Sequence, residues 1–322
     1  MILRTNVKLN FGLNVLRKRD DGYHDIETLF VPCHEFGDTL EVISGDDYSR
    51  TSASLFARYG GLMDPEGQPA LGDTQPQQAL SFVEGRSEDG LRWGRTAPQD
   101  LGGELAQGIS EDGKLMITIA REEGVDWDPL KDLCAKAYFL LANDFQIPPV
   151  KIFLEKNAPV GAGLGGGSAD AAFTLKALNE LFELNLSDAK LAEYASKLGS
   201  DCAFFVWNKP MIGTGRGEIL EPFGLDLDGY VVKVLVPEGI SVSTAEAYRG
   251  IVPHVPQEDS SIKNVLKRPI EEWKDLLVND FEATVFKAHP ELAAIKQSLY
   301  DSSAIYAAMS GSGSAIFGIY KK

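Results

Sequence analysis

The stretch of sequence that decides the fold is Pro159-Val160-Gly161-Ala162-Gly163-Leu164-Gly165-Gly166-Gly167-Ser168-Ala169-Asp170. Five of the seven residues at 161–167 are glycines, which lets the backbone approach a ligand without Cβ atoms in the way. The helix expected next directs its positive end to the same place. We therefore expect residues 159–169 to hold the phosphates of a nucleotide, with the Ser168 hydroxyl bound to a phosphate or to Mg²⁺.

Other kinds of glycine-rich loop fit this stretch less well. A tight turn from strand to helix needs fewer glycines. Gly161, Gly163 and Gly166 match the GxGxxG pattern of dinucleotide-binding proteins. That fold also requires an acidic residue on a second parallel strand about 20 residues later, but Glu180 and Glu183 lie where one expected helix leads into the next. No Gly-Lys-Ser/Thr of a Walker A loop follows, so a phosphate loop of a third kind is indicated.

The composition is that of a globular protein, with 44% hydrophobic and 24% charged residues. A chain of 322 residues commonly forms two domains, which we place at 1–210 and 211–322, with a peripheral insertion at about 44–113. The net charge of −16 argues against a nucleic-acid partner. No targeting or membrane-spanning segment is readable, and the three cysteines lack metal-ligand spacing. We therefore expect a cytoplasmic protein with no membrane partner.

Alternation of apolar and polar residues over 7–15 predicts a half-buried strand with Lys8, Asn10 and Asn14 on one face. Apolar patterns and turn signals predict further strands at 24–30, 39–43, 115–120, 150–154, 230–236, 305–308 and 315–320. Helices are expected at 130–143, 169–182, 187–199, 261–277 and 290–300, and a short hairpin within 80–93. This mixture predicts an α+β protein.

Several motifs in this order resemble the GHMP kinase superfamily. They are Val7-Lys8-Leu9-Asn10, the segment from Asp21-Gly22-Tyr23-His24 to Phe30, the glycine loop, Leu198-Gly199-Ser200-Asp201 with the residues to Phe205, and the segment 310–317. The Asp-Gly-Tyr-His turn is most similar to the kinases that act on 4-diphosphocytidyl-2-C-methyl-D-erythritol. Together the motifs reach from near the start of the sequence to near its end.

The resemblance implies a fold, an activity and a set of ligands. The fold would combine an N-terminal ribosomal-protein-S5-domain-2-like domain with a C-terminal ferredoxin-like α+β domain. The activity would be ATP-dependent phosphorylation of the substrate's 2-hydroxyl in the non-mevalonate isoprenoid pathway, with Mg²⁺. The partner would be a small cytidine diphosphate compound, and the protein a monomer or a homodimer.

The resemblance also implies that Lys8 and Asp201 form the catalytic pair. Phosphoryl transfer mainly requires alignment of the acceptor hydroxyl with the γ-phosphate and neutralisation of the developing charge. A carboxylate can accept the hydroxyl proton, and a nearby ammonium can keep that carboxylate ionised. A buried ion pair with a purely structural role is the alternative.

Substrate contacts are expected from the same resemblance. Tyr23 would stack on the cytosine ring and His24 would hydrogen-bond its edge, since an aromatic face suits a flat base. The remaining expected contacts are Phe30 and Tyr248 in the aromatic slot, and Asn10 and Thr244, with Ser243, on the rest of the substrate. Lys156, just before the loop, is expected to add positive potential.

Two other functions stay open. The chain could be another GHMP kinase with a mevalonate- or homoserine-type acceptor, or a non-catalytic metabolite sensor on the same fold. The presence of both Lys8 and Asp201 argues against the sensor, which needs neither.

Overall fold

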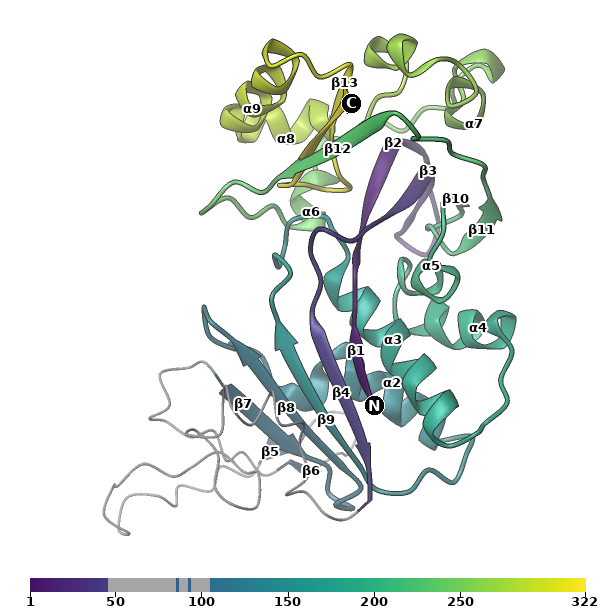
Figure 1. The fold of residues 1–322 in the computed structure, drawn as a ribbon, viewed down its shortest axis with the longest axis vertical. Helices are drawn as coiled ribbons and strands as arrows, with labels where there is room; N and C mark the ends of the chain where they lie inside the picture. Colours follow the sequence, from purple (N-terminus) through teal and green to yellow (C-terminus); the bar gives the residue numbers. More distant parts are fainter. Residues whose placement is uncertain (46–84, 87–91, 94–104) are drawn as a thin grey trace. The chain divides into compact units, whose positions relative to one another are not determined.

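The computed structural model describes residues 1–45, 85–86, 92–93 and 105–322 (Figure 1). The chain divides into two compact units, each built from separate stretches of sequence. Unit 1 comprises Met1–Thr5, Gly37–Asn157 and Asp170–Leu198, and unit 2 comprises Asn6–Phe36, Ala158–Ala169 and Gly199–Lys322. The expected domain boundary near residue 210 stays a prediction. No helix in the described part of the chain has the length and apolar character needed to cross a membrane.

Unit 1 contains a five-stranded sheet in the order β1 (Ile2–Arg4), β4 (Thr39–Ser44), β9 (Val150–Lys156), β8 (Leu115–Arg121) and β7 (Leu105–Ile109). Neighbouring strands are antiparallel except β8 and β9, which are parallel. Helix α2 (Leu133–Ala142), preceded by the 3₁₀ turn η2 (Pro129–Lys131), contacts β8 and α4 (Asp188–Leu198). The expected strands 39–43, 115–120 and 150–154 are thereby confirmed, as are the helices expected at 130–143 and 187–199.

The expected hairpin within 80–93 is confirmed by the antiparallel pair β5 (Gly85–Arg86) and β6 (Arg92–Trp93). Strand β7 lies in the segment 44–113, for which no regular structure beyond that hairpin was expected. Residues 46–84, 87–91 and 94–104 of this expected insertion lie outside the described residues.

A buried cluster of charges in unit 1 overturns the role expected for Lys156. The Lys156 ammonium lies 2.5 Å from Oδ2 of Asp38 and 2.6 Å from Oδ2 of Asp170. Both carboxylates are fully buried, and each accepts a further hydrogen bond, Asp38 from the Asn157 N–H and Asp170 from the Thr5 hydroxyl. The charge of Lys156 is therefore matched by these two carboxylates and adds no free positive potential.

Unit 2 contains two antiparallel sheets. The first has the order β11 (Ile219–Pro222), β10 (Met211–Thr214), β3 (His24–Cys33) and β2 (Val7–Lys18), and the second has the order β12 (Tyr230–Leu235), β14 (Ile316–Lys321) and β13 (Tyr306–Met309). Helix α3 (Gly166–Leu181) begins in unit 2 and continues into unit 1. The other helices of unit 2 are α5 (Cys202–Trp207), α6 (Thr244–Ala247), α7 (Ile262–Val265), α8 (Glu282–Ala288) and α9 (Pro290–Asp301).

Strand β2 differs from the expected half-buried strand in two respects. Residues 7–15 are all buried, so both faces of the strand are covered. The register with β3 shifts between Phe11 and Leu13, because Gly12, at φ +68°, forms a bulge. A bulge moves the following side chains to the opposite face. Asn14 therefore does not share the face of Lys8 and Asn10, and the expectation that it would was wrong.

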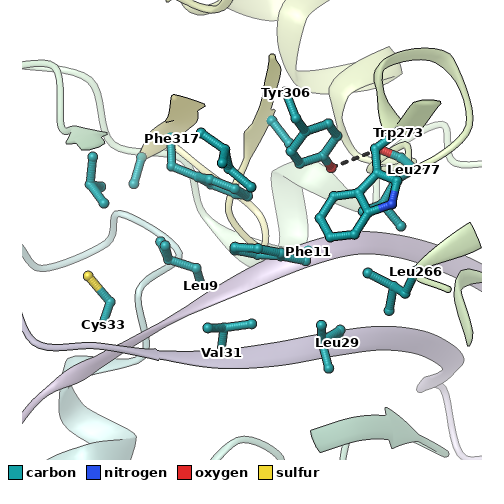
Figure 2. Close-up of a cluster of buried hydrophobic side chains, with 14 of the residues drawn as sticks. Leu9, Phe11, Leu29, Val31, Cys33, Leu266, Trp273, Leu277, Tyr306 and Phe317 are labelled. Carbon is teal, nitrogen blue, oxygen red and sulfur yellow. Dashed lines mark hydrogen bonds between the residues drawn. The ribbon is translucent and has the colours of Figure 1, made fainter. Parts of the chain in front are cut away.

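Aromatic rings form the centre of a core cluster in unit 2 (Figure 2). Phe11 of β2 stacks on Phe317 of β14, with ring centroids 4.8 Å apart. The Tyr306 ring lies edge-on to Trp273 at 5.7 Å, and its hydroxyl donates to the Leu277 carbonyl at 2.8 Å. Stacked and edge-on aromatic pairs stabilise a core beyond their buried area. This packing joins the first sheet of unit 2 to the second.

The continuous helix expected at 261–277 was wrong. The structure has the single turn α7 followed by the 3₁₀ segment η4 (Ile270–Asp275). Pro269 lies between them with an extended ψ of 143°. Proline lacks the N–H that a helix interior requires and disfavours helical backbone at the preceding residue. The apolar spacing is nonetheless used, because Ile262, Val265, Ile270 and Trp273 all enter the core.

Candidate active site

The glycine loop of unit 2 alternates glycines at turns with buried apolar residues. Gly161, Gly163 and Gly165 have φ values of +73°, +74° and +74°, which side chains rarely tolerate. Ala162 and Leu164, between them, are buried in the core cluster of unit 2. The apolar residues thus fix the loop to the protein while the glycines turn the backbone. Ser168 and Ala169 lie in the first turn of α3, which begins at Gly166.

Main-chain hydrogen bonds hold the loop against two other segments. The Leu164 carbonyl accepts from the Lys8 N–H at 2.9 Å, and the Ala162 carbonyl accepts from the Ala315 N–H at 3.0 Å. Asn279 donates from its amide to the carbonyls of Met309 and Gly311, both at 2.8 Å, which fixes the turn between β13 and β14. The loop is therefore held from both sides before a ligand binds, which lowers the entropy lost on binding.

Lys8 passes beneath the loop and ends in a group of oxygens. Its ammonium donates to the Gly163 carbonyl at 2.7 Å and to Oδ1 of Asn10 at 2.5 Å. It also lies 3.5 Å from Oδ2 of Asp201. Burial lowers the pKa of the Lys8 ammonium from its usual 10.5, while the Asp201 carboxylate acts in the opposite direction. The amine is thus held at the loop by neighbours that favour its charged form.

Asp201 precedes helix α5 but does not cap it. An aspartate at this position commonly accepts from N–H groups of the first turn, whereas the Asp201 side chain makes no such bond. Its carboxylate instead lies beside the Lys8 ammonium and the backbone of Gly217, and 31% of the side chain is exposed. A carboxylate that has an ammonium partner and remains partly open to solvent can receive a proton from a bound hydroxyl.

The Asp-Gly-Tyr-His turn lies in the same unit. The Arg19 N–H donates to the Tyr23 carbonyl at 2.8 Å, and the Tyr23 N–H donates to Oδ1 of Asp21 at 3.1 Å. Gly22 has a φ of +85°, which this tight turn requires. Tyr23 is 54% exposed, so part of its ring is available to a flat ligand. The Arg216 guanidinium lies 5.0 Å from the ring centroid.

His24 is placed against Tyr248. The two rings stack with centroids 4.4 Å apart, and Phe281 lies edge-on to Tyr248 at 4.7 Å. Burial, and secondarily the charge of Lys18, lower the pKa of His24, which favours the neutral imidazole. A neutral imidazole has one donor and one acceptor nitrogen, so it can hydrogen-bond to the edge of a nucleobase. Burial and the charge of Asp201 raise the pKa of Tyr248 to about 12.

Three further expected contacts differ in exposure. Phe30 is 1% exposed and packs on Phe204, with centroids 5.3 Å apart, so its ring lies in the interior beneath Lys8 rather than in an open slot. Asn10 is buried and donates to the Thr28 hydroxyl at 3.0 Å while accepting from Lys8. Thr244 is exposed and starts α6, for which the Ser243 hydroxyl accepts the Glu246 N–H.

Curated relatives match nearly the whole chain, and two family models match parts of it. A family model described as GHMP kinases N terminal domain matches residues 132–209, and one described as GHMP kinases C terminal matches residues 261–322. The chain is 41% identical over 320 residues to a 4-diphosphocytidyl-2-C-methyl-D-erythritol kinase of Bacteroides fragilis, covering 99% of this chain and 92% of that protein. It belongs to this family of GHMP kinases.

A second relative and the solved structures extend the comparison. The kinase of the same name from Bacteroides thetaiotaomicron is 39% identical, covering 100% of this chain and 92% of that protein. A crystal structure of a 4-(cytidine 5'-diphospho)-2C-methyl-D-erythritol kinase has a TM-score of 0.63 at 26% identity, covering 99% of this chain and 89% of that one. The mevalonate kinase of Methanococcus jannaschii has a TM-score of 0.54 at 13% identity, with 100% and 90% covered, and shows the fold alone.

The GHMP kinase is thus an ATP-dependent small-molecule kinase with an α+β fold, as the resemblance implied, and ATP is its co-substrate. The structure brings together residues of this kinase that the sequence motifs did not mark. Arg216 and Gly217 meet Tyr23 and Asp201 from the turn between β10 and β11, and Asn279 supports the glycine turn at Gly311. The Gly-x-Gly spacing at 215–217 is a signal that could have marked this turn in the sequence.

Proposed function

We propose that this kinase transfers the γ-phosphate of ATP to the 2-hydroxyl of 4-diphosphocytidyl-2-C-methyl-D-erythritol, a step in isoprenoid precursor synthesis. One observation carries the proposal: the Lys8–Asp201 ion pair adjoins the glycine loop in the same unit that holds the Tyr23–His24 turn. A group that reads a cytosine, a pair that acts on a hydroxyl and a loop for phosphates are the parts that this reaction needs. The names of the 41% and 39% identical relatives support the same substrate.

In this mechanism the 2-hydroxyl oxygen attacks the γ-phosphorus, and the bond from that phosphorus to the β,γ-bridging oxygen breaks to release ADP. Asp201 accepts the hydroxyl proton as the new oxygen–phosphorus bond forms. Lys8 keeps the carboxylate ionised and stabilises negative charge on the transferring group. The N–H groups of the glycine loop and the start of α3 hold the nucleotide in line.

The residues present also fit a magnesium ion that takes most of its ligands from ATP. Among the described residues no group of three or more His, Cys, Asp or Glu side chains is placed to hold a metal. Mg²⁺ characteristically binds through one or two protein oxygens together with phosphates and water. Ser168 offers such an oxygen, whereas burial raises the pKa of the adjacent Cys202 thiol to about 12 and keeps it protonated. When bound, the ion would neutralise charge on the β- and γ-phosphates.

The test is an acceptor comparison with the full chain. ADP release is measured with ATP, Mg²⁺ and one acceptor at a time: the cytidylyl substrate, mevalonate or homoserine. We expect turnover with the cytidylyl substrate and a phosphorus NMR signal for a phosphate ester at its 2-position. If mevalonate or homoserine is turned over and the cytidylyl substrate is not, the chain is a GHMP kinase for another acceptor. If the chain binds nucleotide but turns over no acceptor, a sensor is favoured.

A further inference from the structure

The Tyr23 backbone is fixed, while its side chain is free to swing unless something restrains it. The backbone N–H of Tyr23 is held by Asp21 and its carbonyl by Arg19. The ring itself projects from the turn, with 54% of the residue exposed. An exposed tyrosine samples several rotamers, and ordering one on binding costs free energy. A base that stacks on Tyr23 would therefore bind more tightly if the ring were already held.

Arg216 is placed to provide that restraint. Its guanidinium carbon lies 5.0 Å from the Tyr23 ring centroid, within the range of a cation–π interaction. The turn that carries Arg216 is fixed to β3, because the Ile26 N–H donates to the Gly215 carbonyl at 2.7 Å. The same turn places Gly217 beside the Asp201 carboxylate. One short segment thus lies next to both the Tyr23 ring and the proposed proton acceptor.

Arg216 already has a carboxylate partner, Glu218, and Asp21 lies close enough to feel its charge. Glu218 accepts the backbone N–H of Arg216 at 2.6 Å, and its other oxygen lies 3.5 Å from the Arg216 Nε. The pKa of Asp21 is lowered first by the hydrogen bond from the Tyr23 N–H and also by the charges of Arg19 and Arg216. A guanidinium with two acidic neighbours is poorly placed to be a main phosphate ligand. Its position over the ring is better explained by packing against Tyr23.

We propose that Arg216 is a positioning residue, which holds the Tyr23 ring in the orientation that receives the base, and that Glu218 fixes the direction of the guanidinium. The identity of the base as cytosine rests on the proposed function; the restraint on the ring does not. The expected signature is a change in base affinity with little change in the chemical step, since Arg216 acts on Tyr23 and not on the reacting atoms.

The first experiment measures the ring without any nucleotide. Fluorotyrosine is placed at position 23 of the full chain, and its fluorine resonance is compared between wild type, Arg216→Met and Arg216→Lys. We expect Arg216→Met to move the resonance towards that of a free tyrosine, with Arg216→Lys in between. An unchanged resonance in Arg216→Met would overturn the proposal, whatever the substrate proves to be.

The second experiment measures binding of cytidine and of CDP by calorimetry. We expect Arg216→Met to weaken both by the same factor, roughly 3- to 10-fold, from the lost cation–π contact and ring restraint. The KM for the cytidylyl substrate should rise by a similar factor, with kcat and the KM for ATP nearly unchanged. In a Tyr23→Leu background the Arg216→Met change should have no further effect.

The matched control is Lys233→Met, which removes another cation over a ring, 4.9 Å from the centroid of Tyr320. It should leave cytidine and CDP binding unchanged. A loss confined to CDP in Arg216→Met would make Arg216 a diphosphate ligand and overturn the positioning role. If wild type binds neither cytidine nor CDP, the proposed substrate fails, while the fluorine resonance still decides whether Arg216 restrains the ring.

Discussion

A Cβ atom on Gly163 would lie 2.2 Å from the carbonyl oxygen of Ser310. The phosphate loop therefore needs glycine at this position for its contact with the 310–314 turn as well as for its φ of +74°. Neither atom is at the end of a flexible side chain, so the backbone itself would have to move. From this contact we expect the loop not to accept even alanine at position 163.

We predict that Gly163→Ala lowers the free energy of unfolding by about 1–3 kcal/mol from backbone strain alone. Displacement of the loop should also lower kcat/KM for ATP by on the order of 10-fold or more. The measurements are denaturant unfolding and initial rates at varied ATP. Gly224→Ala is the control, because a Cβ there meets nothing within 4 Å. Equal ATP kinetics in the two variants would show that the loop tolerates the added methyl group.

Asp201→Asn should fold and bind ATP but lose on the order of 10²-fold or more in kcat, because an amide cannot take the hydroxyl proton. The KM for ATP should change little, since Asp201 is proposed to act on the acceptor. Steady-state rates with a matched surface variant, Asp228→Asn, check the result; Asp228 is exposed in the loop before β12. A kcat within a few-fold of wild type would remove Asp201 from the proton-transfer step.

The lowered pKa of Lys8 predicts that the activity of the kinase falls at alkaline pH. Burial lowers its pKa below 10.5, so the ammonium is lost as pH rises through that lowered value, and kcat should fall with it. The stability of the fold should instead increase with pH over part of this range. Between the folded pKa and 10.5 the unfolded chain binds more protons, so the free energy of unfolding rises with pH over that window. The checks are a pH–rate profile and denaturant unfolding at matched pH values. In Lys8→Arg, any remaining activity should lack this limit because a guanidinium stays protonated.

The buried charge cluster of unit 1 predicts a large effect of Lys156→Met. Removing the ammonium takes one ion-pair partner away from two buried carboxylates, which should cost about 3–5 kcal/mol at pH 8. Burial raises the pKa of the Asp170 carboxyl, so the loss should be smaller at pH 5, where this carboxyl binds a proton more readily. Denaturant midpoints at the two pH values measure this. Lys190→Met breaks only an exposed pair with Glu193 and should change stability little at either pH.

Local patterns predicted the parts of this fold that local physics determines. Apolar patterns and turn signals located β3 and β14, and the glycine loop with the apolar run after it located α3, because burial of one face and helix initiation depend on neighbouring residues. The helix expected at 261–277 failed where Pro269 interrupts it. The shared face expected for Asn14 failed at the Gly12 bulge, which depends on pairing with β3 and not on the sequence of β2 alone.

The sequence motifs predicted which residues belong to the site, but not their distances or surroundings. Lys8 and Asp201 could be named from resemblance, but their separation of 3.5 Å follows from the packing of distant segments. Phe30 was expected in the aromatic slot and is buried against Phe204, since a pattern gives the face of a strand and not what covers it; its contact with the substrate stays a prediction. Lys156 carries a positive charge in the sequence, but its two acidic partners come from elsewhere in unit 1.

The stacking of Phe11 on Phe317 has a consequence for synthesis of the protein. The unit that contains the phosphate loop needs an early strand and one of the latest segments of this sequence, so a nascent chain cannot complete it until residue 317 has left the ribosome. Until then Phe11 on β2 lacks the Phe317 ring of β14. Apolar surfaces that stay exposed during synthesis are the ones that chaperones bind. A chain that stops before residue 317 therefore lacks the ring on which Phe11 packs.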